Sequence, residues 1–371
     1  MKLGIFMQPV HDPKRDFNRV LEEDRQAAIL ADELGYSECY IGEHITATVE
    51  PISSPITFMA TLLPVTRQMK FGSGVFCLPQ KHPAMVASEA ALFDHLAKGR
   101  FIMGIGPGAL SSDLEMFGTT DSNRGEMVVE SLDMILKLWS QDPPFDFKGK
   151  YWHISLQDMS RVEFGVGRMP RPFQQPHPPI AISLMSPASP TAKLAGQQGW
   201  IPISGGSFVQ SRYMASHWEM YETGCELAGR DADPDIWRVC RSIIVADSDQ
   251  QAEDHVLDPD GPFAFWFNYL ISSVRARGVE HVVRPDGREH DESVTWQDVA
   301  RSQVAYGSPA TVLDKLVAFR ERTGPFGTLV QTAHEWTDPA LARRSMTLLA
   351  EQVMPKLAQH SKVAGKATAT V

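Results

Sequence analysis

The chain has 371 residues, of which 43% are hydrophobic and 22% are charged, and 35 Lys and Arg against 45 Asp and Glu give a net charge of −10. This composition is that of an ordinary globular protein and excludes disordered and fibrous classes. An acidic chain without a long basic run is poorly suited to nucleic acid or to an anionic membrane surface, so we expect neither as a partner.

The cysteine pattern and the hydropathy indicate in which cellular compartment we expect the protein. The four cysteines (Cys39, Cys77, Cys225 and Cys240) lie far apart and form no C-x-x-C pair, which is typical of a reducing environment. No apolar stretch approaches the roughly 18 residues that a membrane-spanning helix needs. The N-terminal apolar run is too short for a signal peptide, and we expect a cytoplasmic protein.

Short apolar runs alternate with amphipathic helical patterns along most of the chain. In chain order, the predicted strands cover residues 3–7, 37–44, 71–79, 101–106, 179–185, 200–204, 237–247 and 327–332. Helices are predicted at residues 16–34, 82–99 and 122–139, and a further helix ends at about Leu227. Three more helices are predicted to start at Ser189-Pro190, Ser308-Pro309 and Asp338-Pro339. Each of these last three pairs places an N-cap residue before a proline at the first helical position.

Two segments interrupt the alternation. Residues 141–178 are rich in proline and predict an inserted loop or a small hairpin, and residues 257–306 form a second irregular segment. Eight strand-then-helix units predict a parallel sheet and favour a closed α/β fold, the (β/α)8 TIM barrel, over an open doubly wound sheet. We expect one domain over residues 1–360 and a disordered tail at residues 361–371.

The segment GIGPGA at residues 104–109 follows a predicted strand and fits the dinucleotide pattern G-x-G-x-x-[GA]. It comes after the fourth strand, contains Pro107, and lacks the acidic residue expected about 20 positions later. We therefore favour a loop at the carboxyl-terminal mouth of a barrel, where backbone approaches a planar ligand.

Three other places could carry chemistry. His44 follows the second strand and suits proton transfer near neutrality, although a lone histidine is more often a structural hydrogen-bonding residue. Ser186 and Ser189 precede a helix, where binding of a phosphate and simple N-capping are equally compatible with the sequence. Gly72 and Gly74 interrupt the third strand, which indicates either a bulge or a flat ligand against the backbone.

An apolar stripe at helical spacing falls in the second irregular segment. It consists of Phe263, Trp266, Phe267, Leu270 and Val274. Such a stripe is more often core than a lid over an apolar substrate. The chain contains no H-E-x-x-H, P-loop or nucleophile elbow, and we expect no metal site.

Several of these pieces together resemble the bacterial luciferase-like flavin-dependent monooxygenases. The matching stretches are IGEH, FGSGVFCLPQKHP, LAKGRFIMGIGPGALSSDLEMFG and the serines after the fifth strand. The stretches GPGAL…D…M-G and ATVLDKL…TGPFGTL are most similar to the branch that contains limonene monooxygenase. The resemblance covers most of residues 1–250 and resumes near residue 303. It implies a (β/α)8 barrel that binds reduced FMN and activates O2 through a flavin C4a-(hydro)peroxide.

The resemblance also implies residue roles. His44 matches the family's active-site histidine, and Gly74-Val75 matches a dipeptide with a non-proline cis bond under the isoalloxazine ring. Ser186 and Ser189 match the phosphate-binding turn. The full set of implied cofactor-binding residues is Gly74, Val75, Gly106, Arg124, Met185, Ser186 and Ser189.

Two positions depart from the family pattern. Luciferase has a phosphate-binding arginine where this chain has Pro107, and an acidic residue where it has Met185. The resemblance therefore implies a modest affinity for FMN, which suits an enzyme that borrows FMNH2 from a separate flavin reductase. Residues 257–306 correspond to the family's mobile lid, where we expect substrate choice to be decided.

The resulting hypothesis is a two-component, FMNH2-dependent monooxygenase that acts on an apolar small molecule. The same barrel also allows hydride transfer with the deazaflavin F420 or with flavin, and a non-catalytic flavin-binding subunit is a further alternative. By analogy with the family, we expect a homodimer and a transient contact with the reductase.

Overall fold

Eight parallel strands form the central barrel of this computed structural model, which describes residues 1–205 and 209–360. The order around the sheet is β10-β12-β1-β2-β3-β5-β8-β9, and β10 also pairs with β9, which closes the sheet. The strand bounds are β1 (Lys2–Met7), β2 (Glu38–Ile41), β3 (Lys70–Ser73), β5 (Phe101–Gly106), β8 (Ile180–Leu184), β9 (Ile201–Ser204), β10 (Arg238–Val245) and β12 (Thr328–Thr332). Each overlaps one predicted strand, so the predicted (β/α)8 barrel is confirmed. The tail at residues 361–371 lies outside the described residues.

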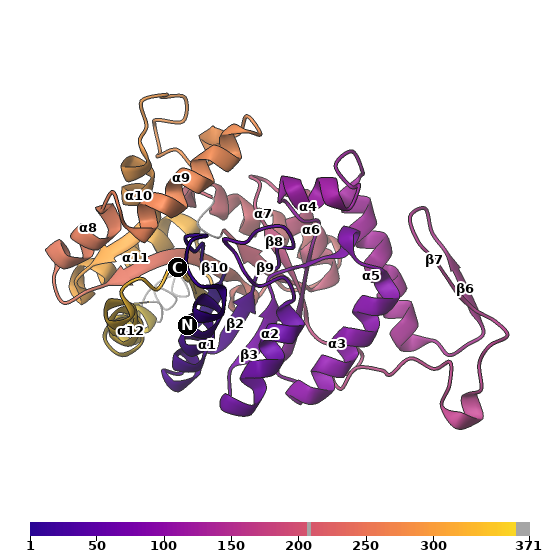
Figure 1. Cartoon of the computed structure of the whole chain (residues 1–371). Coiled ribbons are helices and arrows are strands. Elements are labelled where there is room, and N and C mark those ends of the chain that lie inside the picture. Colours follow the sequence, from indigo (N-terminus) through magenta and orange to yellow (C-terminus); the bar gives the residue numbers. More distant parts are fainter. Residues whose placement is uncertain (206–208, 361–371) are drawn as a thin grey trace. The chain divides into compact units, whose positions relative to one another are not determined.

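The helices follow the strands along the chain (Figure 1). Their bounds are α1 (Phe17–Glu33), α2 (Pro55–Leu62), α3 (Pro83–Ala97), α4 (Ser111–Met116), α5 (Arg124–Ser140), α6 (Pro190–Gln198), α7 (Ser211–Leu227), α8 (Asp249–Leu257), α9 (Pro262–Arg275), α10 (Trp296–Gln303), α11 (Pro309–Thr323) and α12 (Pro339–Leu348). Ser308 and Asp338 occupy the predicted N-cap positions, each before a proline at the start of its helix. Helix α2 was not predicted, although Ser54 and Pro55 provide the same start signal.

The chain divides into two compact units. Unit 1 comprises residues 1–39, residues 48–51 and the chain from residue 182 onward, and unit 2 comprises residues 40–47 and 52–181. The boundaries fall inside β2 and β8, two strands of the same sheet. The single domain over residues 1–360 stays a prediction, and each unit is described separately below. No helix among the described residues is long and apolar enough to cross a membrane.

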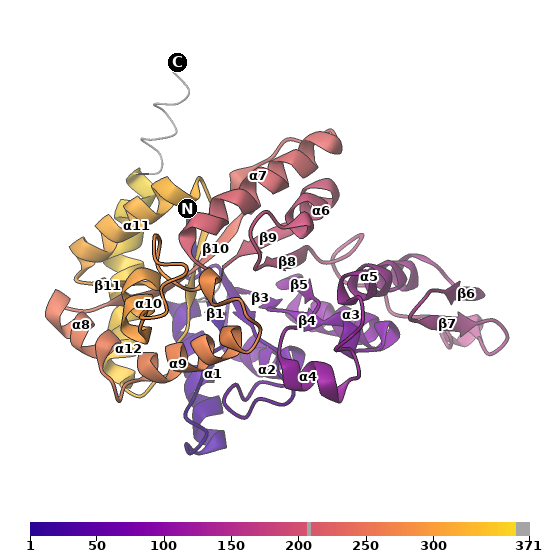
Figure 2. The ribbon, with the colours of Figure 1, turned by 90° about the horizontal axis from the view of Figure 1, so that it is seen from above.

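The first inserted segment, residues 141–178, contains a small antiparallel hairpin in unit 2. Strand β6 (Phe145–Lys148) pairs with β7 (His153–Leu156), so of the two predicted alternatives, an inserted loop or a small hairpin, the hairpin is confirmed. Figures 1 and 2 show it projecting beyond α3 and α5.

The second segment, residues 257–306, contains two α-helices separated by a mostly irregular stretch, so the prediction of an irregular segment was wrong for α9 and α10. It contains α9, α10 and most of β11 (Val304–Gly307), which pairs with β10. The helical signals were present in the sequence: α10 begins with a capping box in which Thr295 and Asp298 exchange hydrogen bonds. Gly261 and Pro262 lie at the N-cap and the first position of α9, whose apolar stripe has the helical spacing noted in the sequence.

The apolar stripe of α9 belongs to the core of unit 1, as the commoner interpretation of such a stripe held. The stripe residues Phe263, Trp266, Phe267, Leu270 and Val274 are all buried. They form one hydrophobic cluster with Val10, Val256, Val283, Val299, Ala300 and Val304. Because burial of each large apolar side chain stabilises the fold by about 1.5–3 kcal/mol, this segment contributes substantially to the stability of unit 1.

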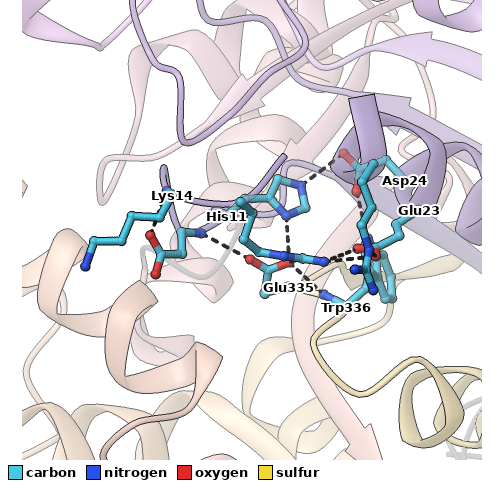
Figure 3. Close-up of polar contacts among 9 residues, drawn as sticks. His11, Lys14, Glu23, Asp24, Glu335 and Trp336 are labelled. Carbon is cyan, nitrogen blue, oxygen red and sulfur yellow. Dashed lines mark hydrogen bonds and ion pairs between the residues drawn. The ribbon is translucent and has the colours of Figure 1, made fainter. Parts of the chain in front are cut away.

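A buried ion cluster joins the loop after β1, helix α1 and the loop after β12 (Figure 3). His11 Nδ1 lies 2.7 Å from Glu335 Oε1, and its Nε2 lies 3.1 Å from Asp24 Oδ2. Arg15 also bonds to Glu335, and the indole N–H of Trp336 donates to Asp24 Oδ1 at 2.7 Å. Since the side chains of His11 and Asp24 are 2% and 0% exposed, these groups rely on one another for hydrogen bonds.

The two carboxylates decide the protonation state of His11. Burial by itself lowers the pKa of His11, but the hydrogen bonds and charges of Asp24 and Glu335 outweigh burial and raise it to about 9. The ring is therefore an imidazolium at neutral pH. Because the folded pKa lies above the ordinary value of 6.5, its stabilisation is complete below pH 6.5 and is lost as the pH rises through 9.

We expect the free energy of unfolding of the wild type to fall by about 2–3 kcal/mol between pH 6.5 and pH 9.5 through this group. His11→Asn should be less stable at pH 6.5 and should lack most of this dependence. Urea unfolding at several pH values measures both quantities. His153→Asn, which removes an exposed His–Asp pair on the hairpin, should keep the wild-type profile. A profile in His11→Asn equal to that of the wild type would contradict the assignment.

Candidate functional site

Glu43 ties the carboxyl end of β2 to the loop that precedes α3 in unit 2. Its Oε2 accepts a hydrogen bond from the backbone N–H of Cys77 at 3.0 Å, and its Oε1 lies 2.8 Å from Lys81 Nζ. Burial raises the pKa of Glu43, and the Lys81 ammonium opposes that rise. With both oxygens engaged, this carboxylate positions the backbone on either side of the candidate site.

His44 follows Glu43 in a loop that is fixed on both sides. Its own N–H donates to the carbonyl of Ile52 at 3.3 Å. Asp113, from α4, accepts hydrogen bonds from the N–H groups of Ile45 and Thr46 at 3.1 and 2.8 Å. Because Asp113 is only 2% exposed, its carboxylate depends on these donors. The backbone that carries the half-buried His44 side chain is thus held in place by these hydrogen bonds.

The peptide bond between Gly74 and Val75 is cis, as the resemblance implies. It separates β3 from the short strand β4 (Phe76–Cys77), so the single predicted strand is interrupted here. The N–H of Gly74 donates to the carbonyl of Ile41 at the end of β2, at 2.7 Å. Strand β4 pairs with β5, where Cys77 lies opposite Gly106. Unit 2 therefore brings three places together: the end of β2 before His44, the Gly74-Val75 segment after β3, and the end of β5 at Gly106.

The other strand glycines in this region are explained by packing inside unit 2. A Cβ atom on Gly72 would lie 2.4 Å from the ring of Tyr40, and one on Gly104 would lie 1.9 Å from the carbonyl oxygen of Ser73. Neither contact is tolerable, so both positions require glycine. For Gly72, close internal packing replaces the bulge or flat ligand considered from the sequence.

Arg124 is the first residue of α5, and its guanidinium is only partly used. Nη1 donates to the carbonyls of Thr119 and Thr120 at 3.4 and 3.2 Å. Nε is buried and has no hydrogen-bond partner among the described residues. An unsatisfied buried N–H of a cation suits an anionic oxygen, so this side chain fits a phosphate.

The remaining predicted residues lie in unit 1, between β8 and α6. Met185 and Ser186 are exposed, whereas Ser189 is 4% exposed at the N-cap of α6. The Ser189 side chain makes no capping hydrogen bond, so N-capping does not explain this serine. The first turn of α6 and the two hydroxyls match what a phosphate group requires.

Two polar residues at these loops had no assigned role in the sequence. Asp113 lies within the GPGAL…D stretch, but its bonds to residues 45 and 46 cross 68 and 67 positions. His217, on α7, lies 2.8 Å from the carbonyl oxygen of Ser186, and nothing near it in the sequence marks the contact. The described residues hold no group of three or more His, Cys, Asp or Glu side chains placed to bind a metal ion.

Comparison with known proteins gives a consistent result. The family model described as luciferase-like monooxygenase matches residues 1–325. The chain is 32% identical over 363 residues to 4-hydroxyprotoasukamycin monooxygenase of Streptomyces nodosus subsp. asukaensis, covering 96% of this chain and 92% of that protein. It is 27% identical to limonene 1,2-monooxygenase of Rhodococcus erythropolis, covering 95% and 85%.

A solved structure is similar over nearly the whole length. It is the oxygenating constituent of 3,6-diketocamphane monooxygenase from Pseudomonas putida, a type II Baeyer-Villiger monooxygenase in complex with FMN. The TM-score is 0.84 at 30% identity, covering 96% of this chain and 98% of that one. The match of the family model over most of the chain, on a (β/α)8 barrel, confirms the resemblance. This chain belongs to the luciferase-like monooxygenase family.

Proposed function

We propose that this chain is the oxygenase of a two-component system, which takes reduced FMN from a separate flavin reductase and uses O2 to oxygenate an apolar small organic molecule. The observation that carries the proposal is the arrangement in unit 2, where the fixed His44 loop follows a strand end that bonds to the cis Gly74-Val75 segment. The relative of known structure, which is named an oxygenating constituent and is in complex with FMN, supports both the cofactor and the separate reductase.

The residues present fit FMN in two respects. Arg124 offers a buried N–H without a partner, and Ser189 offers a hydroxyl that does not cap its helix. We propose that Ser186 and Ser189 in unit 1 bind the phosphate, and that Gly74-Val75, Gly106 and Arg124 in unit 2 contribute to flavin binding. No charged side chain stands at Pro107 or Met185, which favours an affinity low enough for exchange with a reductase.

His44 supplies the proton-transfer group in this proposal. Reduced FMN supplies two electrons, and one atom of O2 enters the substrate while the other leaves as water. An imidazole can hold or deliver a proton through either ring nitrogen. The hydrogen bonds of Asp113 to residues 45 and 46 hold the backbone next to His44 in place.

The apolar substrate is proposed from the relatives. The names of two of them refer to limonene and to a diketone of camphane, which carry no charge. We propose a substrate of the same character, held by shape and apolar contact.

A homodimer is part of the proposal. Helix α3 exposes an apolar stripe in which Met85, Leu92 and Leu96 are 58%, 60% and 56% exposed. Val129, on the neighbouring α5, is 52% exposed (Figure 2). Grouped apolar side chains on a surface favour a protein interface, and a second copy of this chain is the occupant we propose.

The test of the activity uses anaerobically reduced FMN mixed with air-saturated buffer in a stopped-flow instrument. With wild type we expect a transient absorbance that differs from that of both reduced and oxidised FMN. His44→Ala should shorten the life of this transient at least about tenfold, a loss of about 1.4 kcal/mol. His82→Ala, an exposed histidine in the same unit, is the control. The proposal fails if wild type gives no transient, or if the protein binds F420 and not FMN in a titration.

The clamp on the His44 loop gives a second prediction. In Asp113→Asn, an amide N–H₂ replaces one acceptor oxygen and faces a backbone N–H, so the loop should loosen. We expect the transient lifetime to fall about tenfold. Asp94→Asn is a matched control, since Asp94 is 0% exposed and accepts hydrogen bonds from Gln174 instead. Equal loss of lifetime in both variants, measured at equal folded fraction by circular dichroism, would contradict a specific role for Asp113.

Charge on the α3 stripe should abolish the dimer. The double variant Leu92→Lys/Leu96→Lys places two cations in the proposed interface, and we expect a monomer by light scattering coupled to size-exclusion chromatography, where wild type gives twice that mass. Leu227→Lys, at an equally exposed leucine on α7, should remain dimeric. A monomeric wild type would rule this interface out.

A further inference from the structure

Helix α7 holds the turn between β8 and α6 through two consecutive residues. Ser216 Oγ accepts a hydrogen bond from the N–H of Ala188 at 3.0 Å, and His217 Nε2 lies 2.8 Å from the carbonyl oxygen of Ser186. Ala188 has a φ of 46°, in the left-handed region that alanine rarely adopts. The backbone of this turn is therefore set by contacts from α7 rather than by local preference.

The direction of each hydrogen bond at His217 follows from its partners. The indole N–H of Trp237 can only donate, and it donates to Ser204 Oγ at 2.8 Å. Ser204 Oγ in turn lies 3.0 Å from His217 Nδ1. The carbonyl of Ser186 can only accept, so His217 Nε2 carries a proton. The complementary arrangement is Trp237 to Ser204, Ser204 to Nδ1, and Nε2–H to the Ser186 carbonyl.

Burial keeps this chain of donors in one state. Ser204, His217 and Trp237 are each 0% exposed. Burial lowers the pKa of His217, with the bond to Ser186 acting in the opposite direction. A neutral imidazole with its proton on Nε2 is thus the form that matches both neighbours at neutral pH.

The contact matters for any anion bound at the turn. A phosphate group offers only acceptor oxygens, so a backbone carbonyl that turns toward it is repulsive. By holding the Ser186 carbonyl, His217 leaves the hydroxyls and N–H groups as the polar groups of the turn that a phosphate can meet. Ser189, whose hydroxyl does not cap α6, is one of them.

We propose that His217 is a positioning residue for the flavin phosphate, which holds the Ser186 carbonyl through Nε2–H so that the turn presents donors to the ligand. This inference rests on the proposed function, in which Ser186 and Ser189 bind that phosphate. It adds a residue that touches no part of the cofactor and acts only through the backbone.

The test compares oxidised FMN with riboflavin, which lacks the phosphate, by titration of flavin fluorescence. Wild type should bind FMN more tightly than riboflavin. His217→Leu should lower this preference at least tenfold and leave riboflavin binding within about twofold. His217→Gln, whose amide N–H₂ can still donate to the carbonyl, should restore most of the preference. His255→Leu, which removes a histidine packed on Phe263, should keep the wild-type preference.

The outcomes separate the two proposals. If wild type prefers FMN and His217→Leu shows the same preference, the role of His217 is overturned while the phosphate site stands. If wild type shows no preference, the phosphate site fails and the inference fails with it. If His217→Leu does not fold, Ser204→Ala removes the donor to Nδ1 and should lower the preference several-fold. An unchanged preference for FMN in folded Ser204→Ala overturns the proposed role of the hydrogen bonds from Ser204 through His217 to the Ser186 carbonyl.

Discussion

Buried side chains that bond to loop backbone hold the candidate functional positions of this protein in place. Loops after parallel strands have no ladder of their own, so their polar groups need other partners. Glu43 accepts a hydrogen bond from the N–H of Cys77, and Asp113 accepts hydrogen bonds from the N–H groups of the two residues after His44. His217 donates a hydrogen bond to the carbonyl of Ser186. Each contact is local in space and distant in sequence.

The need to pair buried polar groups also explains His11, where the buried group is a cation. There a buried cation satisfies two carboxylates from separate elements, and Arg15 supports the outer one. A buried carboxylate without such a partner would be costly. The cluster therefore fixes the loops after β1 and β12 in unit 1, as Asp113 fixes the loop after β2 in unit 2. Stability and positioning are in both cases consequences of one requirement, that a desolvated charge be paired.

Helix α9 changes how residues 257–306 relate to substrate choice. The segment was expected as a mobile lid, yet its aromatic stripe belongs to a buried cluster of unit 1. Motion of α9 would expose Phe263 and Phe267, each 0% exposed. Substrate selection by this segment would therefore act through side chains at its edges rather than through opening of the whole helix.

The sequence alone was sufficient for the barrel, because the alternation of apolar runs with 3.6-residue periods is a local signal. It was also sufficient for His44 and Ser189 as candidates, through their places after a strand and at a helix start, and for Arg124 through the family resemblance. It showed the helical spacing of residues 263–274, but it predicted residues 257–306 as an irregular segment and missed α10. Only the tertiary structure showed why Gly72 must be glycine and which partners Asp113, His217 and Glu335 have. Those partners lie tens to hundreds of positions away. A hydrogen bond between distant residues leaves no periodic trace in the sequence, since it depends on where folded elements meet and not on the residues beside it.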